Sequence, residues 1–142
     1  MEEIFRSMRT NLQFMLHEGQ KVVLFTSSTS GEGKTFTAAN LSVSFGLLGK
    51  KVILVGLDIR RPRLAELFGI QDHRHGITNL LVKESPTAAE VREQILPSGV
   101  NKNLDLLMAG PVPPNPAELI ARKSLEDIIG ILKDEYDYIM ID

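Results

Sequence analysis

The chain contains no cysteine, so it can form neither a disulfide framework nor a thiolate metal site. Its net charge is only −2, which provides no bulk attraction to nucleic acid or anionic membrane beyond a local basic patch. No apolar run approaches the ~18 residues that a spanning helix needs, and no signal peptide opens the sequence. These absences are typical of a soluble intracellular protein, and we predict no nucleic-acid partner.

The pattern of apolar residues predicts one α/β domain. A length of 142 residues suits a single domain, 1–142. Continuous Val/Ile/Leu-rich runs are typical of strands buried on both faces of a parallel sheet. Such runs, which we predict to be strands, lie at 21–27, 52–57, 104–108 and 138–141. Their alternation with amphipathic segments predicts a doubly wound parallel sheet with right-handed crossovers and helices on both faces.

Spacings of three or four between apolar residues predict the helices. The helix that follows the first strand is expected to turn Leu48 inward, and the short helix after Pro62 is expected to bury Leu67. A capping box of Thr87 and Glu90 opens a later helix. The predicted helices are an opening segment ending near Gly19, a helix after the loop that stops at Gly49, a short helix after Pro62, 76–82, 87–96 and one that starts at Asn115 and continues to Lys133, with a break expected near Ser124.

A phosphate-binding loop is the most informative motif. Residues 27–35 read Ser-Ser-Thr-Ser-Gly-Glu-Gly-Lys-Thr between a strand and a helix, an arrangement that disfavours an ordinary turn. Backbone N–H groups freed by the glycines can wrap a polyphosphate, Lys34 can reach its β- and γ-phosphates, and the Thr35 hydroxyl can bind Mg²⁺. We therefore predict ATP or ADP with Mg²⁺ as ligands. The predicted nucleotide-binding residues are Thr29, Ser30, Gly31, Glu32, Gly33, Lys34, Thr35 and Thr37.

Acidic residues follow two of the predicted strands. Asp58 comes just after the second strand, and Asp142 follows the apolar run Tyr-Ile-Met-Ile, as in a Walker B strand. Ligands of such sheets lie at the carboxyl ends of strands, where carboxylates can hold Mg²⁺. An alternative role for Asp58 is a helix cap or a partner of Arg60 or Arg61. The predicted catalytic residues are Lys34, Asp58 and Asp142, and the predicted metal ligands are Thr35, Asp58 and Asp142.

These motifs together resemble the bacterial tyrosine kinases of capsular and exopolysaccharide export. The segments that carry the resemblance are Walker A at 30–35, a second Walker-type (A′) motif at 52–60, Gly-Pro-Val-Pro-Pro-Asn-Pro-Ala-Glu-Leu at 110–119, and Glu3-x-x-Arg6-x-x-Arg9. The resemblance covers the whole chain. It implies an ATP-dependent protein tyrosine (auto)kinase that phosphorylates a tyrosine of a neighbouring subunit.

The same resemblance implies several partners. Within the opening helix, 1–18, the motif of Glu3, Arg6 and Arg9 is similar to the family's oligomerisation motif and implies a homo-oligomeric ring. The spacing alone equally fits a solvated face with i,i+3 ion pairs. A membrane-spanning polysaccharide co-polymerase segment or subunit and a cognate tyrosine phosphatase are further implied. The implied location is the cytoplasmic face of the inner membrane.

The chain departs from the family in two places. Gly56 stands where the A′ motif usually has an Asp, a favoured candidate for the base that accepts the tyrosine proton, so Asp58 becomes the alternative base. The family also continues beyond Asp142 with further strands and a tyrosine-rich tail. We therefore expect a partial kinase domain, incomplete at the C-terminus, weakly active or inactive, whose first strand has an unpaired outer edge. Tyr136 and Tyr138, at the entrance to the last predicted strand, are expected to pack at the edge of the sheet rather than accept phosphate.

The sequence leaves two other functions open. One is a dimeric ATPase switch, which would carry a second lysine where this chain has Thr29. The other is a non-catalytic scaffold whose assembly is gated by nucleotide, and Gly56 favours it. His17, His73 and His75 show no metal-ligand spacing, and the last two are expected in an exposed loop.

Overall fold

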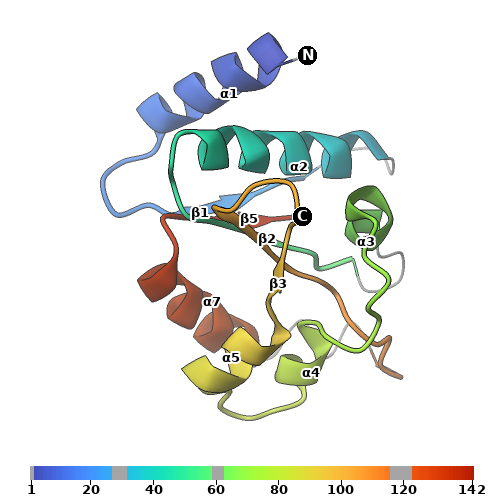
Figure 1. Ribbon diagram of the computed structural model, residues 1–142. Helices are drawn as coiled ribbons and strands as arrows, with labels where there is room; N and C mark the ends of the chain where they lie inside the picture. Colours follow the sequence, from blue (N-terminus) through green and yellow to red (C-terminus); the bar gives the residue numbers. More distant parts are fainter. Residues whose placement is uncertain (1, 27–31, 59–62, 116–122) are drawn as a thin grey trace.

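The computed structural model describes residues 2–26, 32–58, 63–115 and 123–142. Figure 1 shows a central sheet with helices packed above and below it. The elements in chain order are α1 (Glu2–Met15), β1 (Val22–Leu24), α2 (Glu32–Leu47), β2 (Val52–Val55), α3 (Arg63–Phe68), α4 (Thr78–Leu81), α5 (Ala88–Gln94), β3 (Leu96–Pro97), β4 (Leu104–Leu107), α7 (Lys123–Glu135) and β5 (Tyr138–Ile141). In this part of the chain, no helix has the length and apolar character to cross a membrane.

The sheet has the strand order β1-β5-β2-β4-β3. The first four strands in that order run parallel, as the sequence predicts, and Ile141 stands beside both Leu24 and Val55. Val55 in turn stands beside Leu107. The carboxyl ends of these parallel strands therefore line up along one edge of the sheet, which we call the carboxyl edge.

The last strand, β3, differs from the prediction of an all-parallel sheet. It pairs antiparallel with β4, and the helix expected over 87–96 ends at Gln94. The reason is local: Pro97 disfavours helical geometry in the residue before it, and Ile95 already has extended backbone at φ −85° and ψ 134°. A proline is tolerated here because β3 is an edge strand. The capping box of Thr87 and Glu90 is present as predicted.

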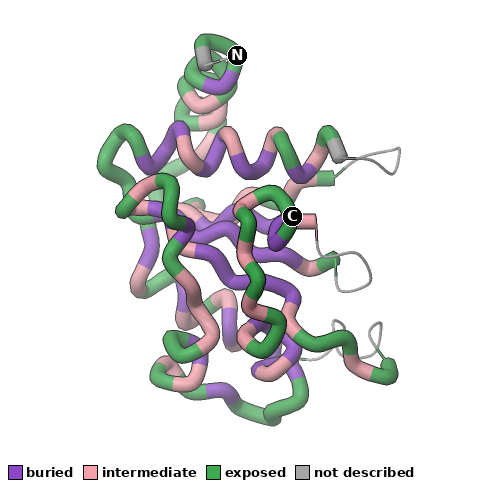
Figure 2. Tube along the Cα trace, turned by 45° about the vertical axis from the view of Figure 1, so that its right-hand side comes forward, coloured by how far each residue is buried: buried purple, intermediate pink, exposed green. Residues whose placement is uncertain are grey.

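Both faces of the sheet are buried, which explains the unbroken apolar strands. On β2, Ile53 and Val55 pack into a core formed with α4, α5 and α7, whereas Val52 and Leu54 pack into a second core formed with α2 and α3. Figure 2 shows the buried residues concentrated in the strands and in the inward side of α2. The predicted placement of helices on both faces is therefore confirmed.

The opening helix α1 lies over α2 and not over the sheet (Figure 1). Phe5 is its buried anchor, and its ring meets Phe36 of α2 edge-on at a centroid distance of 6.0 Å. Arg9 donates hydrogen bonds to the main-chain oxygen of Ser44 at 2.9 Å and to its hydroxyl at 3.1 Å. Arg9 is thus engaged within the chain, while the side chains of Glu3 and Arg6 are exposed.

Two leucines expected to be buried are instead largely exposed. Leu48 is 46% exposed because α2 ends at Leu47 and the chain turns at Gly49, whose φ is +85°. Leu67 is also 46% exposed, because it lines a hollow between α2 and α3. The expected start of a helix at Asn115-Pro116 falls largely outside the described residues.

The two tyrosines pack against the structure. Tyr138 lies on the interior strand β5, where its ring meets Phe45 at a centroid distance of 4.4 Å. The Tyr136 hydroxyl donates a 2.7 Å hydrogen bond to Asp105. Burial, together with that carboxylate, raises the pKa of the Tyr136 phenol above its ordinary value. Tyr136 therefore remains protonated at neutral pH.

Candidate functional site

Three predicted residues converge at the carboxyl edge of the sheet. Lys34 and Thr35 lie in the first turn of α2, and Asp142 follows β5. The Thr35 hydroxyl donates a 2.9 Å hydrogen bond to Asp142 Oδ2, and Lys34 Nζ lies 3.4 Å from Asp142 Oδ1. They meet because β1, which leads toward α2, pairs directly with β5.

The carboxylate of Asp142 is buried but incompletely satisfied. Asp142 is 7% exposed and Thr35 is 5% exposed, whereas the Lys34 side chain is 29% exposed. Within the described ranges, Asp142 Oδ1 accepts no hydrogen bond, although it is shielded from solvent. Native proteins rarely leave such an oxygen without a partner, since its lost hydration costs free energy. The arrangement therefore suits a cation that approaches Asp142 from the open side of the sheet.

Asp58 completes an acidic pair. The Asp142 N–H donates to Val55 O, and the Leu57 N–H donates to Asp142 O, each at 2.9 Å, so the chain beyond β2 runs beside Asp142. A small hollow of about 10 Å³, the acidic hollow, lies between them. Its lining residues are Gly56, Asp58, Arg63, Leu64, Ala65, Met108, Ala109 and Asp142.

These residues fit Mg²⁺, which proteins usually bind through one or two carboxylates together with substrate phosphates. Asp58, Asp142 and the Thr35 hydroxyl are oxygen donors of the required kind. The described part of the chain has no group of three or more His, Cys, Asp or Glu side chains that could cage a metal by itself. A magnesium ion here would therefore take some of its oxygen ligands from the protein and the others from a bound phosphate.

Gly56 leaves no carboxylate at the position where the A′ motif usually has one. The space above it is filled by Leu64 of α3, since a Cβ built on Gly56 would lie 3.0 Å from Leu64 Cδ1. Of the two positions, only Asp58 offers an acid to the site.

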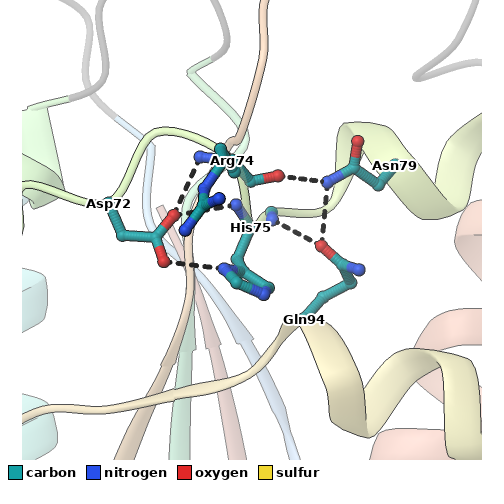
Figure 3. A network of polar contacts seen from close by, with 6 residues as sticks. Asp72, Arg74, His75, Asn79 and Gln94 are labelled. Carbon is teal, nitrogen blue, oxygen red and sulfur yellow. Dashed lines mark hydrogen bonds and ion pairs between the residues drawn. The ribbon is translucent and has the colours of Figure 1, made fainter.

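A polar network holds the next loop at the carboxyl edge (Figure 3). Asp72 accepts hydrogen bonds from the N–H groups of Arg74 and His75 and pairs with His75 Nδ1 at 2.7 Å, and these bonds, the His75 N–H first, lower the pKa of Asp72 to about 2. Gln94 Oε1 accepts from the Gly76 N–H at 2.9 Å. His75, expected in an exposed loop, is thus half-buried.

This network supports the start of the proline-rich motif. Gly76 lies so close to Gly110 that a Cβ at position 76 would overlap the main chain of Gly110. Thr78 Oγ1 donates a 2.7 Å hydrogen bond to Pro111 O. The segment after β4 is thereby held against α4, at the same edge of the sheet as the acidic hollow.

The structure tests some predicted positions and not others. It brings together Lys34, Thr35, Asp58 and Asp142, with Gly33 beside them. Thr37 lies half-buried on α2. Glu3, Arg6 and Arg9 lie on α1 and do not reach this site. The positions outside the described residues are Thr29, Ser30, Gly31, Arg60 and Arg61, and nothing is described of the Glu32 side chain.

Sequence reasoning missed Arg63. This residue lines both the acidic hollow and a larger one of about 430 Å³ between α2 and α3, which we call the α2–α3 hollow. The other residues that line the α2–α3 hollow are Gly33, Thr35, Phe36, Glu66 and Leu67. Its sequence signal is weak, because Arg63 follows Pro62 in an arginine-rich stretch where Arg60 and Arg61 stand closer to Asp58.

A lysine and a hydroxyl that converge on a strand-end aspartate, at the carboxyl edge of a parallel sheet, define a P-loop nucleotide-binding domain. Comparison with known families agrees with this class. The chain belongs to the AAA domain family, whose sequence model matches residues 20–142.

Within that class, the chain is similar to bacterial tyrosine kinases, as its motifs predict. It is 39% identical over 141 residues to the tyrosine-protein kinase YwqD of Bacillus subtilis, a match that covers 99% of the chain and 57% of the relative. It is 34% identical over 143 residues to the putative tyrosine-protein kinase CapB of Staphylococcus aureus, covering 100% of the chain and 60% of the relative. The chain thus spans about three fifths of the length of these curated relatives.

The chain is also similar to solved structures of a bacterial tyrosine kinase domain and of another nucleotide-binding protein. The kinase domain of Escherichia coli tyrosine kinase ETK superposes with a TM-score of 0.88 at 28% identity, covering 99% of the chain and 53% of that domain. The septum site-determining protein MinD of Pyrococcus horikoshii, complexed with Mg-ADP, superposes with a TM-score of 0.67 at 28% identity, covering 86% of the chain and 48% of MinD. The fold is therefore that of the P-loop NTPases.

Proposed function

We propose that this chain is the nucleotide-binding part of an ATP-dependent protein tyrosine kinase. The observation that carries the proposal is the convergence of Lys34 and Thr35 on Asp142 beside Asp58, in a chain whose relatives are named tyrosine kinases. The transferred group is the γ-phosphoryl of ATP, and the acceptor is a tyrosine of a neighbouring subunit. The process served is the synthesis and export of capsular or extracellular polysaccharide, as the sequence resemblance implies.

Lys34 is proposed to leave the carboxylate of Asp142 and pair with the phosphates of ATP when ATP binds. The Lys34 ammonium group lies 3.4 Å from Asp142 Oδ1. A triphosphate brings several negative oxygens to the first turn of α2, and Lys34 turns toward the β- and γ-phosphates. There it stabilises the charge that builds on the γ-phosphoryl oxygens, a contribution typically worth ~10²–10³ in rate for a single donor at comparable oxyanion sites.

Asp142, Asp58 and Thr35 are proposed to hold Mg²⁺. The ion supplies positive charge that neutralises the β- and γ-phosphate oxygens during transfer. Asp142 contributes its buried Oδ1, which lies 3.4 Å from Lys34 Nζ but accepts no hydrogen bond among the described residues. The Thr35 hydroxyl, now bonded to Asp142 Oδ2, keeps that carboxylate oriented.

Transfer requires one bond to form, one to break and one proton to move. The phenolic oxygen of the acceptor forms the new bond to the γ-phosphorus, while the bond from that phosphorus to the β-γ bridging oxygen breaks and its electron pair leaves with ADP. The phenolic proton passes to the carboxylate of Asp58, because Leu64 fills the space at Gly56. A base is useful because a phenol with a pKa of ~10 is about 0.1% ionised at neutral pH.

Assembly into a ring is proposed to use α1. Glu3 and Arg6 are exposed there, and Arg9 is already bonded to Ser44, so the exposed pair is available to a neighbouring subunit. A membrane-spanning co-polymerase segment, a cognate phosphatase and a place at the cytoplasmic face of the inner membrane belong to the same proposal.

A second candidate function has one observation in its favour. Leu64 occupies the space in which relatives of this type place an additional acid, which favours a scaffold that binds nucleotide without transferring its phosphate. Nucleotide binding would then control assembly alone.

The deciding experiment incubates the protein, in its full native length, with Mg²⁺ and γ-labelled ATP. Labelled phosphotyrosine is the expected result. Free phosphate without phosphotyrosine would identify an ATPase switch, and neither product would identify the scaffold. Lys34→Met serves as the control: it should abolish turnover while leaving the circular dichroism spectrum unchanged, and surviving turnover would show that Lys34 is not the phosphate-binding lysine.

A further inference from the structure

The α2–α3 hollow adjoins the proposed phosphate site. It measures about 430 Å³, and residues from the start of α2 and from α3 line it. Thr35 contributes to both the phosphate site and the hollow, since its hydroxyl donates a hydrogen bond to Asp142 and the residue also lines the hollow. A group inside the α2–α3 hollow is therefore next to any phosphate held by Lys34 and Thr35.

The polar side of this hollow is Arg63. Its Nη1 atom is shielded from solvent, and within the described residues it donates to no acceptor. Arg63 also lines the acidic hollow with Asp58 and Asp142, so it stands between the two spaces. Buried guanidinium nitrogens are nearly always hydrogen-bonded, so Arg63 has a donor to offer to a ligand.

Apart from the exposed Glu66, the large side chains that line the hollow and reach solvent are apolar. Phe36 is 38% exposed and Leu67 is 46% exposed, and both line the α2–α3 hollow. The Phe36 ring is held in place by its edge-on contact with Phe5 of α1. Two apolar side chains beside one unpartnered arginine suit a ligand that is flat and apolar with an oxygen at its end, and they suit a bare phosphate poorly.

We propose that the α2–α3 hollow receives the side chain of the acceptor tyrosine. The ring lies between Phe36 and Leu67, and the phenolic oxygen accepts a hydrogen bond from the Arg63 guanidinium once that side chain turns Nη1 into the hollow. This inference rests on the proposed kinase function and names the site of its second substrate. Arg63 does not change the transfer already described: the phenolic oxygen bonds to the γ-phosphorus, ADP leaves with the bridging electron pair, and Asp58 takes the proton.

The hydrogen bond from Arg63 to the phenol also compensates for the absence of an acidic side chain at Gly56. A hydrogen bond from a guanidinium group favours the ionised form of its acceptor, and so lowers the pKa of the phenol. The acceptor then depends less on a strong base. The exposed Glu66 on the same helix disfavours a second anion at the hollow, which argues for a phenol over a carboxylate or free phosphate.

The kinetic test varies ATP and a short single-tyrosine peptide separately, in the protein of full native length. Arg63→Ala should raise KM for the peptide by about tenfold, the order expected for one charge-assisted hydrogen bond, and leave KM for ATP unchanged. Arg63→Lys should recover part of the loss. Arg92→Ala removes an exposed arginine from α5 on the opposite side of the sheet and should change neither constant. A rise in KM for ATP, or no change for the peptide, would overturn the proposal.

A binding measurement separates this inference from the kinase proposal. In the presence of ADP and Mg²⁺, the tyrosine peptide should shift the amide resonances of Phe36, Glu66 and Leu67, and its phenylalanine counterpart should bind at least several-fold more weakly. Arg63→Ala should remove that preference for tyrosine. If the wild-type protein transfers no phosphate but shows these shifts, the kinase function fails and the tyrosine site stands. Shifts absent from all three residues would refute the tyrosine site, whatever the activity.

Discussion

Leu64 of α3 closes over Gly56 at the end of β2: its Cδ1 atom lies 3.0 Å from the place that a Cβ on Gly56 would occupy. Leu64 is 3% exposed and belongs to the core between α2, α3 and the sheet. Any side chain at position 56 therefore competes with a core leucine for space. A larger side chain at position 56 would thus require Leu64 to move or to be replaced by a smaller residue.

We predict that Gly56→Asp alone destabilises the protein, because the new side chain displaces Leu64 from a packed core. The expected loss is ~1–3 kcal/mol, the usual range for overpacking, measured by urea denaturation. Gly56→Asp combined with Leu64→Ala makes room for the carboxylate. Compared with Leu64→Ala alone, the double variant should phosphorylate tyrosine several-fold faster, because a second carboxylate then joins Asp58 as a possible base. Equal rates would show that position 56 cannot supply the base.

Asp142→Asn should separate stability from ligand binding. The change removes a buried charge whose Oδ1 accepts no hydrogen bond in the described part of the chain, and the new amide oxygen can still accept from the Thr35 hydroxyl. The 3.4 Å contact with the partly exposed Lys34 is weakened, so the nucleotide-free protein should unfold within a few degrees of the wild type. Affinity for ADP in the presence of Mg²⁺ should fall at least about tenfold, since the cation loses an ionised ligand. Calorimetry with and without Mg²⁺ measures both effects. A variant that kept its magnesium-dependent affinity would place the metal elsewhere.

The start of α5 should make stability depend on pH. The hydrogen bond from Lys83 at 2.7 Å, followed by the one from the Thr87 N–H, lowers the pKa of Glu90 from 4.5 to about 2. The ionised form is thus favoured by folding, so this contribution is complete above pH 4.5 and disappears as the pH falls toward 2. Glu90→Gln should flatten the pH dependence of the free energy of unfolding within that window.

The control for this experiment is Asp72→Asn, because Asp72 also has a pKa of about 2 and lies in the separate network with His75. Each variant should remove only its own part of the slope, and the two effects should add, since Asp72 and Glu90 share no hydrogen bond among the described contacts. Both carboxylates are partly open to solvent, which screens their partners, so each effect is small. An unchanged profile for Glu90→Gln would mean that its pairs with Lys83 and Thr87 do not persist in solution.

The arginines of α1 should differ in their effects. Arg6→Ala should weaken self-association and leave the melting temperature unchanged, because Arg6 is exposed. Arg9→Ala should weaken self-association and also lower the melting temperature, since it removes the two hydrogen bonds to Ser44 that hold α1 on α2. Sedimentation velocity and thermal melting measure the two properties. Ser44→Ala removes one of those bonds and should lower the melting temperature slightly without changing the sedimentation profile. Association unaffected by Arg6→Ala would rule out that residue as an interface contact.

Much of the fold could be predicted because its signals are local. An apolar run such as 52–55 can be buried on both faces only in a sheet covered by helices, and Thr87 with Glu90 can start a helix without help from distant residues. The strand–loop–helix order around Lys34 and the strand before Asp142 likewise indicate a phosphate site. These features depend on residues within a few positions of one another.

The sequence by itself therefore determined the class of fold, the phosphate loop and the acidic residues that face it. Tertiary structure alone decided which groups meet. Pairing of β1 with β5 brings Thr35 to Asp142, and packing of α3 against α2 fills the space at Gly56 with Leu64 and leaves Arg63 without a described partner. The physical reason is that spacing along the chain sets the face on which a side chain lies, whereas strand order and helix packing set what it contacts.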